Sequence, residues 1–469
     1  MKTRMAIAAV MAAVSLGASA ANPKYVFLFI GDGMSVPQRM IADEFSRKIG
    51  KGPLAMNSMP FTATTRTCSA DSLVTDSAAA ATAIACGTKT CNHYSGVDPD
   101  RKPVYSSAVS AKKAGFKVGI ISTVTITHAT PAGFYAHRED RGDAYGISID
   151  LANSGFDFFA GGGLDVDDGG SKYHSEYKQC GEAYKYARSK GYRIVKTKDE
   201  FLALKPGDGP ILTKFTNGAL PNAIDDDGSK PSLSELVAKA IEMLDCEKGF
   251  FIMAEGGRID WAGHSNDAAT NLRDVLALDE AVKVALAFQD KHPDETLVVV
   301  TGDHETGGMT MGFAGTGYAL YMERLGNQTM SVGKFEKEMG KLYGKRTDVS
   351  YDEVKPVIEK AFGFKFEADR SDPMRLHSDE RAELREAFDH DAELHKKRVE
   401  ENKAYDGERH YILGGTCRTL MSHKSGIAWT TGSHTAMPVL TTAKGCRAEL
   451  FTGFIENTDI AKKMKSFYE

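Results

Sequence analysis

A dense group of acidic and histidine residues occupies positions 255–264 of the sequence. Within it, Asp260 and His264 are four residues apart, so they would share one face of a helical turn. Carboxylate oxygen and imidazole nitrogen together form a ligand set that suits zinc. The same spacing also fits a surface ion pair between an aspartate and a histidine. This segment therefore indicates a metal site but leaves the ion pair open.

A second segment could supply a nucleophile. Asp76 and Ser77 are followed by a run of alanines, which predicts a helix that stops at Gly87. Ser77 would then lie at a helix N-terminus, where free N–H groups and the helix dipole favour an anion. The alternative is that Ser77 or Asp76 only caps the helix.

Two loop segments add polar groups of other kinds. Residues 127–131, which include His128 and Thr130, lead along the chain to Arg141. A guanidinium has a planar fork that can hold two phosphate oxygens, which a lysine cannot imitate. Near the C-terminus, His434 lies in a loop of small residues, although a lone loop histidine indicates little by itself.

The elements that must position these residues follow from the hydrophobic pattern. Short, continuous apolar runs alternate with helical patterns, as expected for a sheet covered by helices on both faces. In the clearest helix, Ser232 and Glu235 form a possible capping box, and the helix leads directly into an apolar run. We therefore predict an α/β fold, a three-layer α/β/α sandwich with a central, mainly parallel sheet. The predicted strands are 25–30, 118–122, 250–254 and 296–301.

Four of the chemically useful residues directly follow predicted strands: Asp32, Glu255, Asp303 and His304. In open α/β sheets, ligands bind outside the carboxyl ends of the strands. A carboxylate at a single strand end is often only a helix cap. Because carboxylates or histidines follow three of these strands, we expect one shared site at this edge of the sheet.

The N-terminal 20 residues resemble a secretory signal peptide. Two basic residues precede an apolar stretch at 5–16, and small residues at 18–20 fit a cleavage site that leaves Ala21 as the first mature residue. The apolar stretch is shorter than the ~20 residues a membrane helix needs, and no later segment supplies a span. We therefore expect a periplasmic or secreted protein without a membrane span in the mature chain.

The composition excludes some functions and leaves others open. Removing residues 1–20 takes away two of the 58 basic residues and none of the 63 acidic ones, which leaves a net charge of −7. This balance argues against a nucleic-acid-binding role. The seven cysteines leave at least one unpaired in a monomer, and their pairing cannot be deduced from the sequence.

Residues 21–469 read as a single large domain with an insertion, because no linker rich in proline, glycine or serine divides them. Residues 321–423 differ from the rest because they are rich in charge. A long helix is predicted from Ser378 to about Asn402, with only a modest apolar stripe. This helical insertion is either a solvated addition or a segment that binds a partner or covers the active site.

Six motifs, in order, make the chain resemble the alkaline phosphatase family over nearly the whole mature length. They are Gly-Asp-Gly at 31–33, Thr-Asp-Ser-Ala at 75–78, Ala-Thr-Pro at 129–131, the segment 255–264, Gly-Asp-His-Glu at 302–305 and Gly-Ser-His-Thr at 432–435. The resemblance implies an enzyme that hydrolyses phosphate monoesters, releases inorganic phosphate and forms a homodimer.

The resemblance also implies a role for each matching residue. One zinc would be held by Asp260, His264 and His434, and a second zinc by Asp32, Asp303 and His304. Magnesium would be bound through Asp32, Thr130 and Glu255, so that Asp32 bridges two metals. Ser77 would attack phosphorus to form a phosphoserine, while Arg141 holds the phosphate oxygens.

Two residues depart from part of the family. His128 stands where some bacterial members carry aspartate, and Trp261 where they carry lysine; the pair resembles a different branch. We expect both to lie beside the metal ligands, with simple packing as the alternative. A histidine here places a potentially cationic group near the magnesium position, so the identity of that ion stays open.

Three other functions remain to be compared with a phosphate monoesterase. Phosphodiesterases and nucleotide pyrophosphatases of the same superfamily lack the third, magnesium-type site, so Thr130 and Glu255 favour monoesters. Sulfatases need a modified residue in a Cys/Ser-x-Pro-x-Arg context, which is not found around Ser77. A catalytically silent metal-binding protein would retain the metal ligands without turnover.

Overall fold

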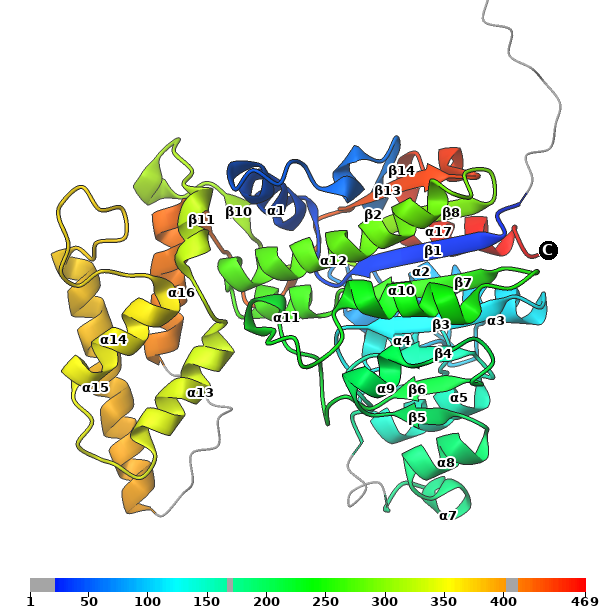
Figure 1. The fold of residues 1–469 in the computed structure, drawn as a ribbon, viewed down its shortest axis with the longest axis horizontal. Helices are drawn as coiled ribbons and strands as arrows, with labels where there is room; N and C mark the ends of the chain where they lie inside the picture. Colours follow the sequence, from blue (N-terminus) through cyan, green and yellow to red (C-terminus); the bar gives the residue numbers. More distant parts are fainter. Residues whose placement is uncertain (1–21, 167–171, 402–411) are drawn as a thin grey trace, which may run out of the picture.

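The computed structural model describes residues 22–166, 172–401 and 412–469. A ten-stranded sheet forms the centre of the molecule, with helices on both faces (Figure 1). Its strand order is β14-β2-β13-β8-β1-β7-β3-β4-β6-β5. The strands are β1 (Tyr25–Gly31), β2 (Phe61–Arg66), β3 (Lys117–Ser122), β4 (Phe158–Ala160), β5 (Arg193–Val195), β6 (Ile211–Thr213), β7 (Phe250–Glu255), β8 (Thr296–Gly302), β13 (Val439–Gly445) and β14 (Gly453–Glu456).

The sheet is mainly parallel, as predicted. Only β13 runs antiparallel to its neighbours, β2 and β8. Strand β1 is buried along its whole length: Phe27 and Phe29 enter one hydrophobic core, while Val26 and Leu28 enter the core on the opposite face. Such a strand reads as a continuous apolar run because helices cover both of its faces.

Two sets of helices form the outer layers. One face carries α1 (Val36–Lys48), α10 (Leu233–Leu244) and α12 (Ala268–Gln289). The other face carries α2 (Ser77–Cys86), α3 (Ser107–Lys113), α5 (Ala144–Asn153), α8 (Ala183–Ser189) and α17 (Asn457–Lys465). Helix α10 begins with the predicted capping box of Ser232 and Glu235. The short helices are α4 (Ala129–Ala132), α7 (Tyr177–Cys180), α9 (Lys198–Leu202) and α11 (Arg258–His264), with 3-10 turns at Ala55–Ser58, Ala223–Asp225, Ala314–Thr316, Met322–Asn327 and Ala448–Leu450.

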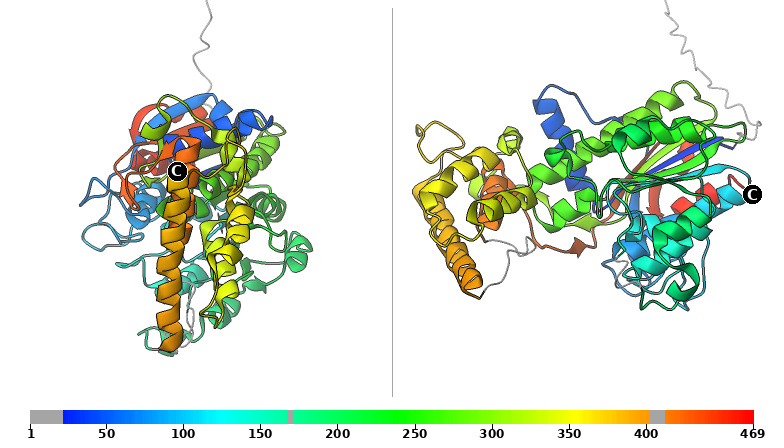
Figure 2. Two further views of the ribbon diagram at one scale, coloured as in Figure 1. Left: turned by 90° about the vertical axis from the view of Figure 1, so that its left-hand side faces the viewer. Right: turned by 60° about the horizontal axis from the view of Figure 1, so that its bottom comes forward.

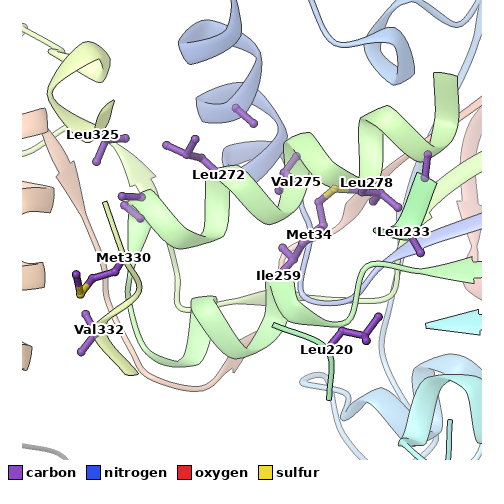
Figure 3. Close-up of a cluster of buried hydrophobic side chains, with 14 of the residues drawn as sticks. Met34, Leu220, Leu233, Ile259, Leu272, Val275, Leu278, Leu325, Met330 and Val332 are labelled. Carbon is purple, nitrogen blue, oxygen red and sulfur yellow. The ribbon is translucent and has the colours of Figure 1, made fainter. Parts of the chain in front are cut away.

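Helix α12 anchors the segments that carry the strand-end residues. Its side chains Leu272, Val275 and Leu278 belong to one buried cluster with Met34, which follows β1, and Ile259 of α11 (Figure 3). Packing of this kind fixes the turn after β1 and the helix after β7 against a common support.

Four helices lie to one side of the sheet, at the left of Figure 1: α13 (Val332–Tyr343), α14 (Tyr351–Phe362), α15 (Ser378–Glu400) and α16 (Ile412–Ser425). Helix α15 begins at the predicted residue and is long and straight in Figure 2. Leu384, Ala387 and Phe388 are its buried stripe. Asp267, the N-cap of α12, accepts hydrogen bonds from Gln328 Nε2 and the backbone N–H of Val332, so this helical cluster is tied to the helix layer that covers the sheet.

The N-terminal segment, the absence of a membrane span and the cysteines were also subjects of sequence predictions. Residues 1–20, the predicted signal peptide, lie outside the described residues. Among the residues described, no helix is both long and apolar enough to cross a membrane. All seven cysteines are described, and none of them forms a disulfide with another described residue.

Candidate metal centre and nucleophile

Three adjacent central strands bring four of the predicted residues together. Strands β7, β1 and β8 are neighbours, and Ile30 of β1 lies opposite Glu255 of β7 and Thr301 of β8. Asp32, Glu255, Asp303 and His304 therefore meet at one edge of the sheet, and all four side chains are fully buried. These four residues thus lie together at the carboxyl ends of their strands, where ligands bind in open α/β sheets.

The first group of possible metal ligands is Asp32, Asp303 and His304, whose ligand atoms lie within 4.8 Å of one another. His304 Nε2 is 3.2 Å from Asp32 Oδ1 and 3.3 Å from Asp303 Oδ2. The backbone N–H groups of Gly33 and His304 donate to Asp303 Oδ1, while Asp303 Oδ2 has no hydrogen-bond partner. One oxygen is thus fixed by the backbone and the other faces the group.

The second group is Asp260, His264 and His434. Helix α11 places Asp260 and His264 on one face, with His264 Nε2 3.3 Å from Asp260 Oδ2. His434 comes from β12 (His434–Thr435), which pairs with β9 (Glu305–Thr306); a second two-stranded sheet joins β10 (Thr310–Met311) to β11 (Ile427–Ala428). The second group thus combines α11 with a strand from the C-terminal part of the chain.

The ring nitrogens of these two histidines are oriented by backbone carbonyls. His264 Nδ1 is 2.7 Å from the oxygen of Gly432, and His434 Nδ1 is 2.8 Å from the oxygen of Thr75. A carbonyl can only accept, so each Nδ1 donates and each neutral ring keeps a lone pair on Nε2. These two Nε2 atoms are 3.2 Å apart, an arrangement that a cation between them would stabilise.

The third group is Asp32, His128 and Glu255. His128 Nδ1 lies 3.8 Å from Glu255 Oε1 and 3.9 Å from Asp32 Oδ2. None of these three atoms has a hydrogen-bond partner, and the hydroxyl of buried Thr130 lacks one as well. Glu255 Oε2 accepts a 2.5 Å hydrogen bond from Ser122. Unsatisfied buried polar atoms are rare, so their concentration here fits a site built for a cation.

Ser77 is the first residue of α2, as predicted. Asp76 is the N-cap, and its Oδ1 accepts from the backbone N–H of Ala79. The Ser77 hydroxyl oxygen is buried and lies 3.1 Å from His304 Nε2 and 3.5 Å from Asp32 Oδ1. The serine therefore borders the first group of ligands, with the positive end of a helix directly behind it.

Arg141 and Trp261 lie at the more exposed side of the same site. Arg141 Nη1 donates a 3.0 Å hydrogen bond to Asp76 Oδ2, and Nη2 is 3.4 Å from His128 Nε2. The Trp261 ring stands edge-on to the His128 ring, at 6.1 Å between centroids, and the Arg258 guanidinium lies 4.7 Å from the Trp261 ring. Both predicted neighbours, His128 and Trp261, thus lie beside the clustered carboxylates and histidines.

The buried charges perturb one another strongly. Burial raises the pKa of Asp32, and the charges of Asp260 and Glu255 raise it further. Burial and the Asp32 charge raise the pKa of Asp303. Burial acts in the same direction on Asp260, but the hydrogen bond from His264 and the charge of His304 outweigh it and lower the pKa. Burial and His304 lower the pKa of His434 to about 3. Cations are the natural counter-charge for such a set.

Two residues that support the site had no predicted role. Thr306 donates a 2.6 Å hydrogen bond to Asp260 Oδ1. Buried Glu305 accepts from Thr435 at 2.5 Å and from Gln38 at 2.7 Å. Glu305 belongs to the Gly-Asp-His-Glu motif, which was the only sequence signal that could have pointed to it.

The fold and the site define a metal-dependent hydrolase with an α/β/α sandwich, and comparison with known proteins gives the family. The family model for alkaline phosphatase matches residues 23–469. Alkaline phosphatase 3 of Bacillus subtilis is 32% identical over 453 residues, which are 94% of this chain and 88% of that protein. The repressible alkaline phosphatase of Saccharomyces cerevisiae is 30% identical, covering 97% and 83%. The chain therefore belongs to the alkaline phosphatase family and is a phosphoric monoester hydrolase.

Solved structures agree with this assignment. The cold-active alkaline phosphatase from a psychrophilic Shewanella species matches with a TM-score of 0.78 and 28% identity, covering 95% of this chain and 100% of that one. The alkaline phosphatase from the Antarctic bacterium TAB5 matches with a TM-score of 0.64 and 26% identity, covering 96% and 98%. Mutants of the Antarctic enzyme in which one histidine is replaced by aspartate or glutamate contain bound magnesium.

Proposed function

We propose that this chain is an exported phosphate monoesterase that works through a phosphoserine on Ser77. The observation that carries the proposal is the position of the Ser77 hydroxyl, at a helix N-terminus and 3.1 Å from His304 Nε2. A free serine hydroxyl is a weak nucleophile near neutral pH and needs activation by its surroundings. The buried carboxylates and histidines around it supply the ligands for that activation.

The three groups of ligands support two zinc ions and one magnesium ion. Zinc prefers the mixed nitrogen and oxygen sets, which are Asp260, His264 and His434, and Asp32, Asp303 and His304. Magnesium prefers oxygen, and Asp32, Thr130 and Glu255 offer three oxygens with no hydrogen-bond partner. When bound, these ions would lower the pKa of a coordinated hydroxyl or water and neutralise charge on phosphoryl oxygens.

The residues of the chain divide the reaction between them. The Ser77 hydroxyl gives up its proton to solvent, and Oγ forms the bond to phosphorus while the bond to the leaving oxygen breaks. That oxygen departs with the electron pair and takes up a proton from solvent. Water then attacks the phosphoserine, which releases inorganic phosphate and restores the hydroxyl. The N–H groups at the start of α2 and the guanidinium of Arg141 would hold the phosphoryl oxygens throughout.

Asp76 connects these two anion-binding elements. It caps α2 through Oδ1 and accepts from Arg141 through Oδ2, so the guanidinium and Ser77 are held on the same support. Charge-assisted hydrogen bonds of this kind fix geometry as well as adding energy. Positioning is a large part of catalysis in phosphoryl transfer.

His128 lies against the proposed position of the third ion. Its Nδ1 points toward Glu255 and Asp32, where a magnesium ion would otherwise meet only oxygen. The magnesium in the histidine-to-aspartate mutant of the Antarctic relative supports a site of this type in the family. We assign magnesium to Asp32, Thr130 and Glu255, and we place His128 and Trp261 beside it.

Export, dimerisation and the domain bounds are proposed from the sequence and the family resemblance. The signal-like residues 1–20 support export to the periplasm or the medium, with cleavage near Ala20 and Ala21. Family resemblance supports a homodimer. We treat residues 21–469 as one catalytic domain, with residues 321–423 as a helical insertion.

The test is hydrolysis of a chromogenic phosphate monoester at alkaline pH by the mature protein loaded with zinc and magnesium. We expect turnover that a chelator abolishes and that falls by several orders of magnitude in Ser77→Ala. A matching diester should react far more slowly. Faster diester hydrolysis would favour the phosphodiesterase reading, and metal retention without turnover would favour a silent protein.

A further inference from the structure

The loop that leaves the nucleophile helix returns to the start of the same helix. Helix α2 ends at Cys86, and Gly87 follows in the left-handed conformation that reverses the chain. Six positions after the helix end, Asn92 lies beside the residues that precede Ser77. Its Oδ1 accepts from the backbone N–H of Asp76 at 2.9 Å, and its Nδ2 donates to the backbone oxygen of Val74 at 3.1 Å. The Asn92 side chain thus holds residues 74–76, which directly precede Ser77, at their first and last residues.

The next residue, His93, connects that segment to the arginine. Its backbone N–H donates to Asp76 Oδ2 at 3.1 Å, and its backbone oxygen accepts from the N–H of Arg141 at 2.8 Å. Asp76 Oδ2 also accepts from the Arg141 guanidinium. Asp76 Oδ2 therefore accepts hydrogen bonds from both the His93 backbone and the Arg141 side chain, and His93 also binds the Arg141 backbone.

His93 makes these contacts from an unfavourable backbone conformation. Its φ is +74°, in the left-handed region that residues other than glycine seldom adopt. Such a conformation is maintained only where surrounding contacts require it. The contacts at His93 are the two backbone hydrogen bonds to Asp76 and Arg141.

Two further contacts make the loop a firm support. The N–H of Asn92 donates to Asp71 Oδ1 at 3.0 Å. Ser95 exchanges a pair of backbone hydrogen bonds with Arg138, at 2.9 and 2.8 Å, so the loop and the segment that ends at Arg141 run as a short antiparallel pair. The loop is therefore bound both to the start of α2 and to the arginine segment.

We propose that Asn92 and His93 are positioning residues that set the affinity of the enzyme for phosphate by holding Arg141 in register with Ser77. The inference rests on the proposed roles of Ser77 and Arg141. Neither residue needs to touch the substrate, because Asn92 acts through the backbone of Asp76 and Val74, and His93 acts through the Asp76 carboxylate and the Arg141 backbone. A change in this loop is expected to weaken phosphate binding even when the fold is kept.

The first experiment uses the unusual backbone of His93. A valine at this position disfavours φ above zero, whereas a glycine adopts it freely. In the metal-loaded enzyme, we expect His93→Val to raise the calorimetric dissociation constant for inorganic phosphate about ten-fold, and His93→Gly to stay within about two-fold of wild type. Arg447, whose φ is +64° in a loop near the C-terminus, gives a matched control. Arg447→Val should lower thermal stability and leave phosphate affinity unchanged.

The second experiment asks whether Asn92 acts through Arg141, and it also serves if His93→Val does not fold. Asn92→Ala should weaken phosphate binding about ten-fold in the wild-type background and have little effect in an Arg141→Ala background. Phosphate affinity unchanged in Asn92→Ala, or an undiminished effect without Arg141, would overturn the inference. If either of these two results were found while Ser77→Ala is inactive, the proposed function would stand and only the role of Asn92 would fall. An active Ser77→Ala would instead overturn the proposed function.

Discussion

Four of the proposed metal ligands, Asp303, Glu255, His264 and His434, have one atom held by the protein and another that faces the site. Asp303 Oδ1 accepts two backbone N–H groups, Glu255 Oε2 accepts from Ser122, and the Nδ1 atoms of His264 and His434 donate to carbonyls. Contacts of this kind fix the tautomer and the orientation of a ligand before any ion arrives. The ligand set is thus largely preorganised by the chain itself.

At this scale, the first prediction concerns the third metal. Replacing His128 with aspartate would bring a third carboxylate toward Asp32 and Glu255 and make the site all oxygen. Because magnesium prefers oxygen ligands, we expect His128→Asp to bind magnesium about ten-fold more tightly. Titration calorimetry of the zinc-loaded protein would measure this affinity. His292→Asp, at a half-buried histidine elsewhere, should leave it unchanged; an equal gain in both variants would contradict the prediction.

The sequence predicted which carboxylates and histidines lie together better than it predicted the residues that hold them. Asp32, Asp260 and Asp303 lie in short motifs whose residue types indicate metal binding, and the structure clusters them as expected. Asn92, Glu305 and Thr306 act through hydrogen bonds to distant parts of the chain, such as the bond between Thr306 and Asp260. Residue type and spacing do not specify such partners, because they exist only after the chain has folded.

Among the elements, the small pairing of β9 with β12 joins two ligand segments. Strand β9 follows His304 directly, and β12 begins with His434. Glu305 is buried between them and accepts from Thr435, Gln38 and the backbone N–H groups of Gly308 and Met309. The two-residue strands alone could not fix this geometry, so Glu305 is the main support of the pairing.

We therefore expect Glu305→Ala to lose metal. Without the carboxylate, four donors lose their acceptor and the segments of His304 and His434 separate. Zinc content after dialysis, measured by elemental analysis, should fall to half or less of the wild-type value. Glu305→Gln keeps one acceptor oxygen and should retain more zinc than the alanine variant. Full zinc content in Glu305→Ala would show that β9 and β12 stay paired without this side chain.

The regular elements were easier to predict than the irregular ones. The alanine run gave α2, and the capping box gave α10, because each is specified by neighbouring residues. Strand β13 was missed: its burial alternates only in part, and its place between β2 and β8 depends on pairing with strands far away in the sequence. Short strands such as β9 and β12 lack any periodic signal of their own.

For the whole molecule, the long helix α12 contains a buried carboxyl group with an altered proton affinity. Asp274 of α12 accepts from the backbone N–H of Ala223 through Oδ1, whereas its Oδ2 has no partner. Burial raises the pKa of Asp274 to about 7, although that hydrogen bond and the charge of Arg258 oppose the rise. The folded protein therefore favours the protonated form of this group.

This raised pKa makes stability depend on pH in a defined direction. Protonated Asp274 contributes fully below about pH 4, the pKa of an unfolded aspartate, and the contribution is lost as the pH rises through about 7. Asp274→Asn should remove this dependence. The free energy of unfolding of the variant minus that of wild type should therefore be up to a few kcal/mol larger at pH 8 than at pH 5, since one pKa unit is about 1.4 kcal/mol. Chemical denaturation at both values would measure the difference.

The exposed Asp348 provides the control for this comparison, because its side chain is 80% exposed. Asp348→Asn should follow the pH dependence of the wild type. If Asp274→Asn did the same, the carboxyl group would have to be ionised in the folded protein across this range.

The position of β13 inside the sheet has a consequence for how the enzyme is made. This strand lies between β2 and β8, and His434 just before it contacts Thr75, 359 positions earlier in the chain. A ribosome thus synthesises Ser77 long before the last ligand and the strand that completes the sheet. The growing polypeptide carries the proposed nucleophile before the proposed centre around it is finished, so we expect products of premature termination to be inert. Synthesis of the C-terminal segment is therefore the event that turns the chain into a hydrolase.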